Sequence, residues 1–352
     1  MAGFRVVLIE HGYGTSRYER EIIEAAGGEF VDAQDRSLDE ALELCRDAEG
    51  IMLRRIQVSP EMIRRFERCR TICRYGVGTD NVDREAATAA GIIVANVPDY
   101  CIDEVSTHAM ALLLACVRNV ASTHEAMRRG GWDIPRAAAV HRLSGRTLGI
   151  VGLGQIGSAV ARKLGGWGLR LLATDPFAEP ERAATLGVEL VELEELCRES
   201  DYLSVHVPLL PETHHLIGPR QLGLLAAGAM LVNTSRGPVV DTEALLESLD
   251  GGQLAAAALD VFEEEPLPHD SPLRAHPRVT LTDHTAWHSE ESQVELQTSA
   301  ARAVATVCTG GLPASVGNPE VIERLGRLDE WEPAECMQWR LKRMGLPMGG
   351  ET

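Results

Sequence analysis

The strongest constraint on the fold is a repeated alternation of short apolar runs with stretches of helical spacing. Runs such as FRVVLIE, GIMLR and TICRYGVG are rich in Val, Ile and Leu, and they alternate with segments such as SRYEREIIEAAG and SLDEALELCRD. Apolar strands that are each followed by a helix are typical of a parallel sheet covered on both faces. The sequence therefore predicts an α/β protein.

The alternation occurs twice along the chain. It stops at a long apolar helix around Glu104 to Arg118 and restarts at RTLGIVGLG, which predicts two doubly wound parallel-sheet domains in series. The final helix, which begins ESQVELQ, follows the last strand of the second set, so we expect it to return to the first domain. The predicted domains are a discontinuous one of residues 1–101 plus 289–317 and a second of residues 102–288. The tail, residues 318–352, receives no predicted role.

Composition excludes several classes of protein. The 34 basic and 52 acidic residues give a net charge of −18, which argues against nucleic acid or an anionic membrane as a partner. The longest apolar run, AMALLLACV, is too short to span a bilayer, and the first residues lack the pattern of a signal peptide. Eight cysteines without a CxxC pair predict reduced thiols in a cytoplasmic protein. No metal site is predicted.

A glycine-rich turn in IVGLGQIG predicts a dinucleotide site, because it follows a strand and opens a helix. The first glycine allows the tight turn, the second admits a pyrophosphate, and the third lets helix and strand pack closely. The free N–H groups of the helix then face the phosphates. The same spacing is also compatible with a turn that binds nothing. The predicted cofactor contacts are Gly152, Gly154, Gln155, Ile156 and Gly157.

Asp175 ends the next predicted strand, where it would accept hydrogen bonds from the adenosine ribose and repel a 2′-phosphate. No arginine follows in residues 176–179 to receive that phosphate. NAD is therefore expected rather than NADP.

Three chemically suited side chains follow later strands: Arg236 after LVNTS, Glu265 after LDVFEE, and His284 after RVTLTD. Open α/β sheets place their ligand sites at these strand ends. Reduction of a carbonyl needs a proton donor, and a carboxylate beside a histidine keeps the imidazole charged near neutral pH. An arginine would grip an α-carboxylate through two parallel hydrogen bonds.

Each of these side chains also has a purely structural interpretation, as a solvated ion pair or a histidine at the edge of a core. Their occurrence together along one rim favours hydride transfer to a keto acid. His206, in SVHVP, is expected to be packing near the cofactor.

The order of these motifs resembles the D-isomer-specific 2-hydroxyacid dehydrogenase family. The resemblance covers about residues 5 to 317, through RYGVGTDNVD, NVPDYCIDEVSTHAMALLLA, RTLGIVGLGQIG, LVNTSRGPVVDTEAL, ALDVFEEEP and the histidine segment. Within the family, HTAWHSEE is most similar to the C-terminal binding protein branch. The fold that this implies is a flavodoxin-like substrate domain and a Rossmann NAD-binding domain.

The resemblance also implies roles for single residues. Arg236 would bind substrate, His284 would donate the proton with Glu265 as its partner, and Trp287 would line the keto-acid pocket. Thr234 and Asp260 would contact the nicotinamide half of NAD, and Val207 the adenosine end. The family usually has proline before the histidine, whereas this chain has Asp283, which we expect to face solvent.

Further substrate contacts are implied in the first domain. The GVG turn, with Val77 and Gly78, would present N–H groups to the substrate carboxylate. Arg74 would also reach the substrate, or else be a surface charge. Arg54 and Arg55 occupy the place where phosphoglycerate-type members hold a distal phosphate, and strand alternation turns one of the two toward solvent.

The main hypothesis is therefore an NAD-dependent reductase of a 2-keto acid to a D-2-hydroxy acid. One alternative is the same chemistry on a keto acid with a second anionic group, such as a phosphonate, phosphate or dicarboxylate. Another is an NAD(H)-sensing, co-repressor-like binding module. Residues 120–145 resemble the arm by which family members form homodimers.

Overall fold

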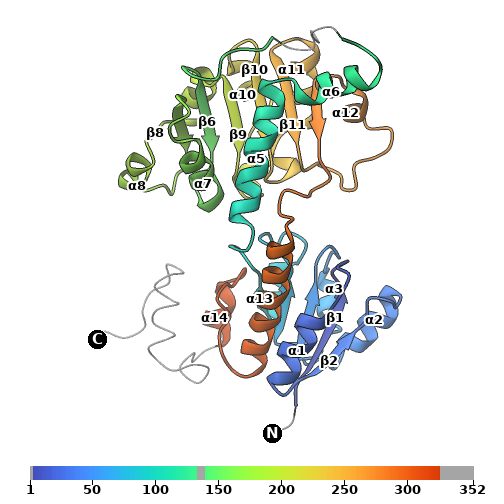
Figure 1. The fold of residues 1–352 in the computed structure, drawn as a ribbon. Coiled ribbons are helices and arrows are strands. Elements are labelled where there is room, and N and C mark those ends of the chain that lie inside the picture. The colour runs from blue at the N-terminus through green and yellow to red at the C-terminus, as the bar shows by residue number, and fades with distance from the viewer. Residues whose placement is uncertain (1–2, 133–138, 326–352) are drawn as a thin grey trace, which may run out of the picture. The chain divides into compact units, whose positions relative to one another are not determined.

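The computed structural model describes residues 3–132 and 139–325. The chain divides into two compact units, one of the residues before Cys101 together with those from Ser289 onward, and the other of Cys101–His288 (Figure 1). Each contains one parallel β-sheet with helices on both faces. The predicted α/β class and its two doubly wound sheets are confirmed.

The first unit has a five-stranded sheet in the order β2-β1-β3-β4-β5. The order reverses between β1 and β3, so the crevice at their carboxyl ends is where a doubly wound sheet binds ligands. β3 is buried at every residue, as expected of a parallel strand covered on both faces. The strands are β1 (Arg5–Glu10), β2 (Glu29–Asp32), β3 (Gly50–Leu53), β4 (Thr71–Arg74) and β5 (Ile93–Ala95).

Helices α1 and α13 pack together, with α13 against β3, β4 and β5, and α2, α3 and α4 contribute to the core on the opposite face. α13 begins at a capping box in which Ser289 accepts a hydrogen bond from the backbone of Ser292. α3 is only four residues long, and Ile63 and Phe66 are the well-buried side chains in and just after it. The helices are α1 (Arg17–Ala25), α2 (Leu38–Cys45), α3 (Pro60–Ile63), α4 (Arg84–Ala89) and α13 (Glu290–Cys308).

Residues 318–325, which received no predicted role, complete the core of the first unit. The buried Asn318 side chain accepts from the Val94 N–H at 2.8 Å and donates to the Ile92 carbonyl at 3.0 Å. Helix α14 (Glu320–Leu325) then buries Val321 and Ile322. The rest of the predicted tail lies outside the described residues.

The second unit has a seven-stranded sheet in the order β12-β11-β10-β9-β6-β7-β8. The order reverses at β6 and β9, which places the expected dinucleotide site at their carboxyl ends. β8 was not identified from the sequence, because its apolar run is only three residues long. The strands are β6 (Thr147–Val151), β7 (Arg170–Thr174), β8 (Val188–Leu190), β9 (Tyr202–Val205), β10 (Ala229–Asn233), β11 (Leu254–Leu259) and β12 (Val279–Leu281).

Two hydrophobic cores lie against this sheet. One contains side chains of α5, α7 and α8, and the other contains side chains of α9, α10 and α11. α5 packs against β10, β11 and β12, and Figure 1 shows it in front of the sheet. The remaining elements are α5 (Ile102–Val117), α6 (Val120–Arg128), α7 (Gln155–Leu164), α8 (Pro180–Thr185), α9 (Leu193–Glu199), η1 (Pro211–Thr213), α10 (Pro219–Leu224), η2 (Gly237–Val239), α11 (Thr242–Asp250) and α12 (Pro272–Ala275).

Two findings concern α5 and α6. Among the described residues no single helix is long and apolar enough to cross a bilayer, although α5 and α6 taken together pass that test across a bend of 63°. α6 belongs to the predicted dimerisation arm, of which residues 133–138 lie outside the described part of the chain.

Candidate active site

The glycine-rich turn between β6 and α7 forms an open cradle. Gly152 has φ +93°, a backbone conformation that favours glycine, and its N–H donates to the Thr174 carbonyl at 2.9 Å. A Cβ at Gly157 would collide with the Gly152 carbonyl oxygen, so the third glycine allows the helix to start this close to the strand. A Cβ at Gly154 would meet no atom within 4 Å, which leaves room above the helix terminus. This arrangement fits a pyrophosphate at the first turn of α7.

Asp175 is held rigidly at the end of β7. Its Oδ2 accepts from the Leu153 N–H and its Oδ1 from the Phe177 N–H, each at 2.8 Å. The carboxylate is therefore linked directly to the glycine turn. It lies where the sequence predicted a ribose contact.

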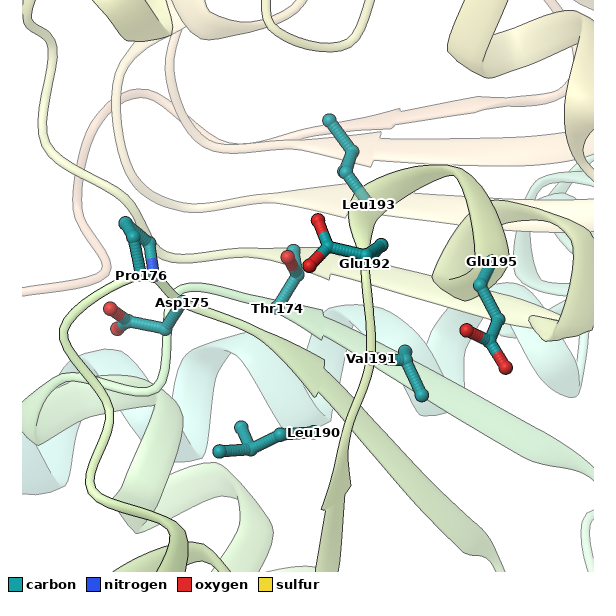
Figure 2. Close-up of a pocket in the computed structure, with 8 residues that line it drawn as sticks. All are labelled: Thr174, Asp175, Pro176, Leu190, Val191, Glu192, Leu193 and Glu195. Carbon is teal, nitrogen blue, oxygen red and sulfur yellow. The ribbon is translucent and has the colours of Figure 1, made fainter.

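Asp175 also lines a pocket of about 500 Å³ between the ends of β7 and β8. Figure 2 shows residues from the end of β7 on one side and those that follow β8 on the other. Apolar side chains make up part of the wall, and its charged residues are all acidic: Asp175, Glu192 and Glu195. The negative charge of these three carboxylates disfavours a further phosphate on the ribose. The two glutamates were missed from the sequence because β8 was missed.

The segment after β9 packs against the glycine turn. Val207 lies so close that a Cβ at Gly152 would be 2.8 Å from Val207 Cγ1. His206 makes a 2.8 Å hydrogen bond to the Ser204 hydroxyl, and burial lowers the pKa of His206 to about 4. His206 is therefore neutral near neutral pH and suits the packing role expected for it.

The loop after β10 carries Thr234 and Arg236. The buried Asn233 side chain shapes this loop, because it accepts from the Ser235 N–H at 3.0 Å and donates to the Arg236 carbonyl at 2.9 Å. Thr234 is buried, and within the described residues its hydroxyl has no hydrogen-bond partner. A buried hydroxyl without a partner is costly, so it is suited to meet a polar group of a bound ligand.

Glu265 and His284 form the central pair of the site. His284 Nδ1 lies 2.6 Å from Glu265 Oε2, and Glu265 Oε1 accepts from the Phe262 N–H at 3.0 Å. Burial alone would raise the pKa of Glu265, but the hydrogen bond and charge of His284, the Phe262 N–H and Arg236 together lower it. The carboxylate thus remains ionised until the pH falls below the usual range of a glutamate. Since Nδ1 faces Glu265, Nε2 is the ring nitrogen available to a substrate.

Asp260 organises the loop that presents His284. This carboxylate is 1% exposed and accepts from the Thr285 and Ala286 N–H groups at 3.0 Å and from the Thr282 hydroxyl at 2.6 Å. Its backbone carbonyl accepts from the His284 N–H at 2.8 Å. His108 on α5 completes the network, with Nε2 3.0 Å from the Thr282 hydroxyl. Asp260 therefore has a structural role besides the predicted cofactor contact.

Residues on either side of His284 differ in exposure. His284 itself has φ +57°, and Trp287 stabilises this turn by donating from Nε1 to the His284 carbonyl at 3.0 Å. Trp287 is half-buried and Asp283 is exposed, as expected for Asp283. The proposed role of Trp287 as a pocket wall remains a prediction.

The first unit holds a separate cationic cluster at the ends of β1, β3 and β4. Arg54 is half-buried, donates to the His11 carbonyl at 3.2 Å and lies 5.1 Å from the Tyr13 ring centroid, whereas Arg55 is exposed. Burial raises the pKa of Tyr13 to about 12, although the charges of Arg54 and Arg74 oppose this rise. The charge of each of these two guanidinium groups therefore acts on the Tyr13 hydroxyl.

The GVG turn follows β4 in the same unit. Gly76 has φ +126°, and a Cβ there would collide with the guanidinium of Arg74, so glycine lets Arg74 fold back over the turn. Val77 is exposed and accepts from the Asn96 side chain, and Gly78 is half-buried. The turn thus presents accessible backbone.

Comparison with known proteins identifies the family. Residues 110–286 match the family described as "D-isomer specific 2-hydroxyacid dehydrogenase, NAD binding domain". The chain belongs to this family. The matched segment of the chain contains the glycine turn, Arg236, Glu265 and His284, and the match supports the expected cofactor, NAD.

Relatives of this chain carry several enzyme names. It is 40% identical to D-3-phosphoglycerate dehydrogenase of Methanocaldococcus jannaschii over 86% of this chain and 58% of that one. It is 40% identical to glyoxylate reductase of Korarchaeum cryptofilum over 76% of this chain and 81% of that one. A crystal structure of a glyoxylate reductase from Paecilomyes thermophila is 27% identical, covers 90% of this chain and 99% of that one, and superposes with a TM-score of 0.82. The chain thus spans little more than half of the phosphoglycerate dehydrogenase that it resembles.

The predicted site residues of the chain fall into two groups. The structure brings the glycine turn, Asp175, Val207, Thr234, Asp260, Glu265 and His284 to the carboxyl ends of one sheet, with Arg236 near enough to act on Glu265. Arg54, Arg74 and the GVG turn gather in the other unit. The special similarity to the C-terminal binding protein branch remains a prediction.

Proposed function

We propose that the protein is an NAD-dependent D-2-hydroxyacid dehydrogenase that interconverts a 2-keto acid and a D-2-hydroxy acid. The observation that carries this proposal is the 2.6 Å pair of His284 and Glu265 on the same sheet edge as the dinucleotide cradle. A histidine with one nitrogen held by a carboxylate and the other free is suited to general acid–base catalysis.

The cofactor fits the residues present. The glycine turn and α7 would hold the pyrophosphate, Asp175 the adenosine ribose, and the buried Thr234 hydroxyl a polar group of the nicotinamide half. Bound there, the nicotinamide supplies a hydride to the keto carbon in reduction and accepts it in oxidation.

The chain's own residues manage the substrate and the proton. Arg236 would bind the α-carboxylate through two parallel hydrogen bonds and hold the adjacent carbonyl in place. Negative charge develops on the carbonyl oxygen as the hydride arrives, and His284 Nε2 donates its proton there. Glu265 would stabilise the protonated imidazole before the transfer and hold the ring in one orientation. In the oxidative direction the same nitrogen takes the hydroxyl proton.

A panel of 2-keto acids tests the proposal. With NADH present, loss of nicotinamide absorbance should accompany reduction of at least one keto acid, and the product should be the D-isomer. A protein that binds NADH and turns over no member of the panel would instead support the NAD(H)-sensing alternative.

The substrate is proposed to carry a second anionic group, for which the first unit provides two guanidinium groups. The charges of Arg54 and Arg74 both act on the Tyr13 hydroxyl, and the half-buried Arg54 lies 5.1 Å from the Tyr13 ring centroid. Partly desolvated guanidinium groups are suited to a carboxylate or phosphate. The similarity to a phosphoglycerate dehydrogenase is consistent with this substrate class.

Arg54→Gln should separate singly from doubly charged substrates. We expect kcat/KM for a dicarboxylic or phosphorylated keto acid to fall roughly tenfold or more, because one charged hydrogen bond contributes about 1.5–3 kcal/mol. The kcat/KM for pyruvate should fall less than about twofold, which is within the usual effect of a surface substitution. Arg55→Gln is the matched control, since Arg55 is exposed. Equal losses on both substrate types in Arg54→Gln would contradict a second anion site.

A homodimer and a cytoplasmic location also remain proposals. The segment around α6 supports the dimer, because Val120, Met127 and Trp132 are 55%, 48% and 87% exposed. A second copy covering them would remove apolar surface from water. The mass of the protein in solution should be twice that of one chain. The seven described cysteines are all free, which is consistent with a reducing compartment.

A further inference from the structure

His215 connects three loops at the edge of the sheet that carries His284. It lies in the segment after β9, and its Nε2 is 3.1 Å from Glu263 Oε2, while its Nδ1 is 3.6 Å from Asp241 Oδ2. Glu263 follows β11 in the loop that ends at Glu265, and Asp241 is the N-cap of α11, after the loop that contains Arg236. One imidazole thus contacts both neighbouring loops.

The backbone of His215 is held in an uncommon conformation. Its φ is +50°, which costs energy for a residue other than glycine and persists where surrounding contacts determine it. The His215 N–H donates to the Pro238 carbonyl at 2.8 Å, and the Ile217 N–H donates to the Val239 carbonyl at 3.1 Å. These bonds fix the segment along the loop after β10 and direct the imidazole toward Glu263.

Glu263 is the second residue of the bridge formed with His215. Its Oε2 meets His215, and its Oε1 accepts from the Thr242 N–H at 2.8 Å in the first turn of α11. Burial alone would raise the pKa of Glu263, but these hydrogen bonds and the charge of His215 lower it. The ionised carboxylate is therefore shared between two elements.

The loop held by the His215–Glu263 bridge is the one that carries Glu265. Phe262 supplies the N–H that orients Glu265, and Glu263 is the next residue along the chain. Gly237, directly after Arg236, packs so closely on this loop that a Cβ there would collide with the Phe262 carbonyl. A shift at Glu263 therefore reaches Glu265 along the backbone and Arg236 through this contact.

We propose that His215 is a positioning residue: its bridge to Glu263 holds the loop from Phe262 to Glu265 so that the Glu265 carboxylate stays on His284. This inference rests on the proposed function. Arg236, from the loop after β10, lies near enough for its charge to lower the pKa of Glu265, whereas Asp260 holds the His284 loop through its backbone carbonyl and its carboxylate. His215 contacts neither member of the pair and acts through Glu263.

His215→Asn is the primary test, because asparagine tolerates a positive φ and its shorter side chain cannot span to Glu263. We expect kcat for keto-acid reduction to fall about tenfold, the loss of roughly one hydrogen bond from the transition state, with NADH affinity unchanged. The acid limb of the pH–rate profile should move to higher pH, since a Glu265 carboxylate displaced from His284 loses the hydrogen bond and the charge that lower its pKa. His269→Asn is the matched control, because His269 is exposed.

Variants of Glu263 test the same bridge without touching the strained backbone. Glu263→Ala should reproduce both the fall in kcat and the moved limb, and Glu263→Gln should restore most activity, because the amide can accept from Thr242 and donate to His215. The double variant His215→Asn/Glu263→Ala should lose little more than either single one. If His215→Asn fails to fold, the Glu263 pair decides alone.

The outcomes separate this inference from the proposed function. No turnover by the wild-type protein would overturn the proposed function itself. If the wild type turns over and both His215→Asn and Glu263→Ala keep its pH–rate profile, only the positioning role is overturned. Additive losses in the double variant would also overturn it.

Discussion

His284→Asn should lower kcat for keto-acid reduction by about 10²- to 10⁴-fold, the usual contribution of a positioned general acid. The asparagine amide is not acidic enough to replace the proton donor at Nε2, so water must protonate the carbonyl oxygen as negative charge develops on it. Asparagine is the preferred replacement, because His284 has φ +57° and asparagine adopts that conformation with little strain. Steady-state reduction with saturating NADH measures the effect.

NADH affinity is the control for this variant. The dinucleotide cradle lies on other loops, so the dissociation constant of NADH should change less than about twofold if the fold is intact. Glu265→Gln should lose less activity than His284→Asn, because the amide still hydrogen-bonds to the ring but no longer stabilises its charged form. Undiminished turnover by His284→Asn would contradict the proposed chemistry.

The fold was predictable because the relevant signal is local. A strand–helix alternation identifies parallel sheets from short windows of sequence, and the glycine spacing marks the first turn of the second sheet. Elements too short to carry a period were not predictable. β8 has three residues, and α14 follows the buried Asn318, whose two backbone contacts are to a strand more than 200 positions earlier in the sequence.

The candidate site was predictable in part, because the carboxyl ends of parallel strands lie along one edge of a sheet. Arg236, Glu265 and His284 each follow a strand, and strands of one parallel sheet present these ends along one edge. Which side chains pair depends on loop conformation, which has no short-range signal. Asp260 illustrates this: its carboxylate binds three groups of the His284 loop, from Thr282 to Ala286, an arrangement created by the folded loop.

His215 shows the same limit more clearly. Its segment, PETHHLIG, gives no reason to prefer one histidine over the other, and only the folded loop directs the second toward Glu263. Its positive φ is a consequence of that loop's contacts. The sequence therefore predicts the candidate catalytic residues better than the residues that position them.

Arg236→Lys should lower kcat/KM for keto acids roughly ten- to hundredfold, with most of the effect in KM. Lysine keeps the positive charge but cannot form two parallel hydrogen bonds to a carboxylate, and a charged hydrogen bond contributes about 1.5–3 kcal/mol. The loop should tolerate the change, because Asn233 holds the backbone of residue 236 and Gly237 provides the close packing on Phe262. Steady-state kinetics with a fixed, saturating concentration of NADH measures this loss.

A ketone that lacks the carboxylate distinguishes substrate binding from general damage. If Arg236 binds the α-carboxylate, the wild type should have a much higher kcat/KM for pyruvate than for hydroxyacetone. Arg236→Lys should lower kcat/KM for pyruvate and leave the low value for hydroxyacetone nearly unchanged. Arg220→Lys is the matched control, because that side chain is 73% exposed and pairs with Glu194. A loss of equal size on both ketones would mean that Arg236 acts through the cofactor or the loop, and the carboxylate would then need another partner.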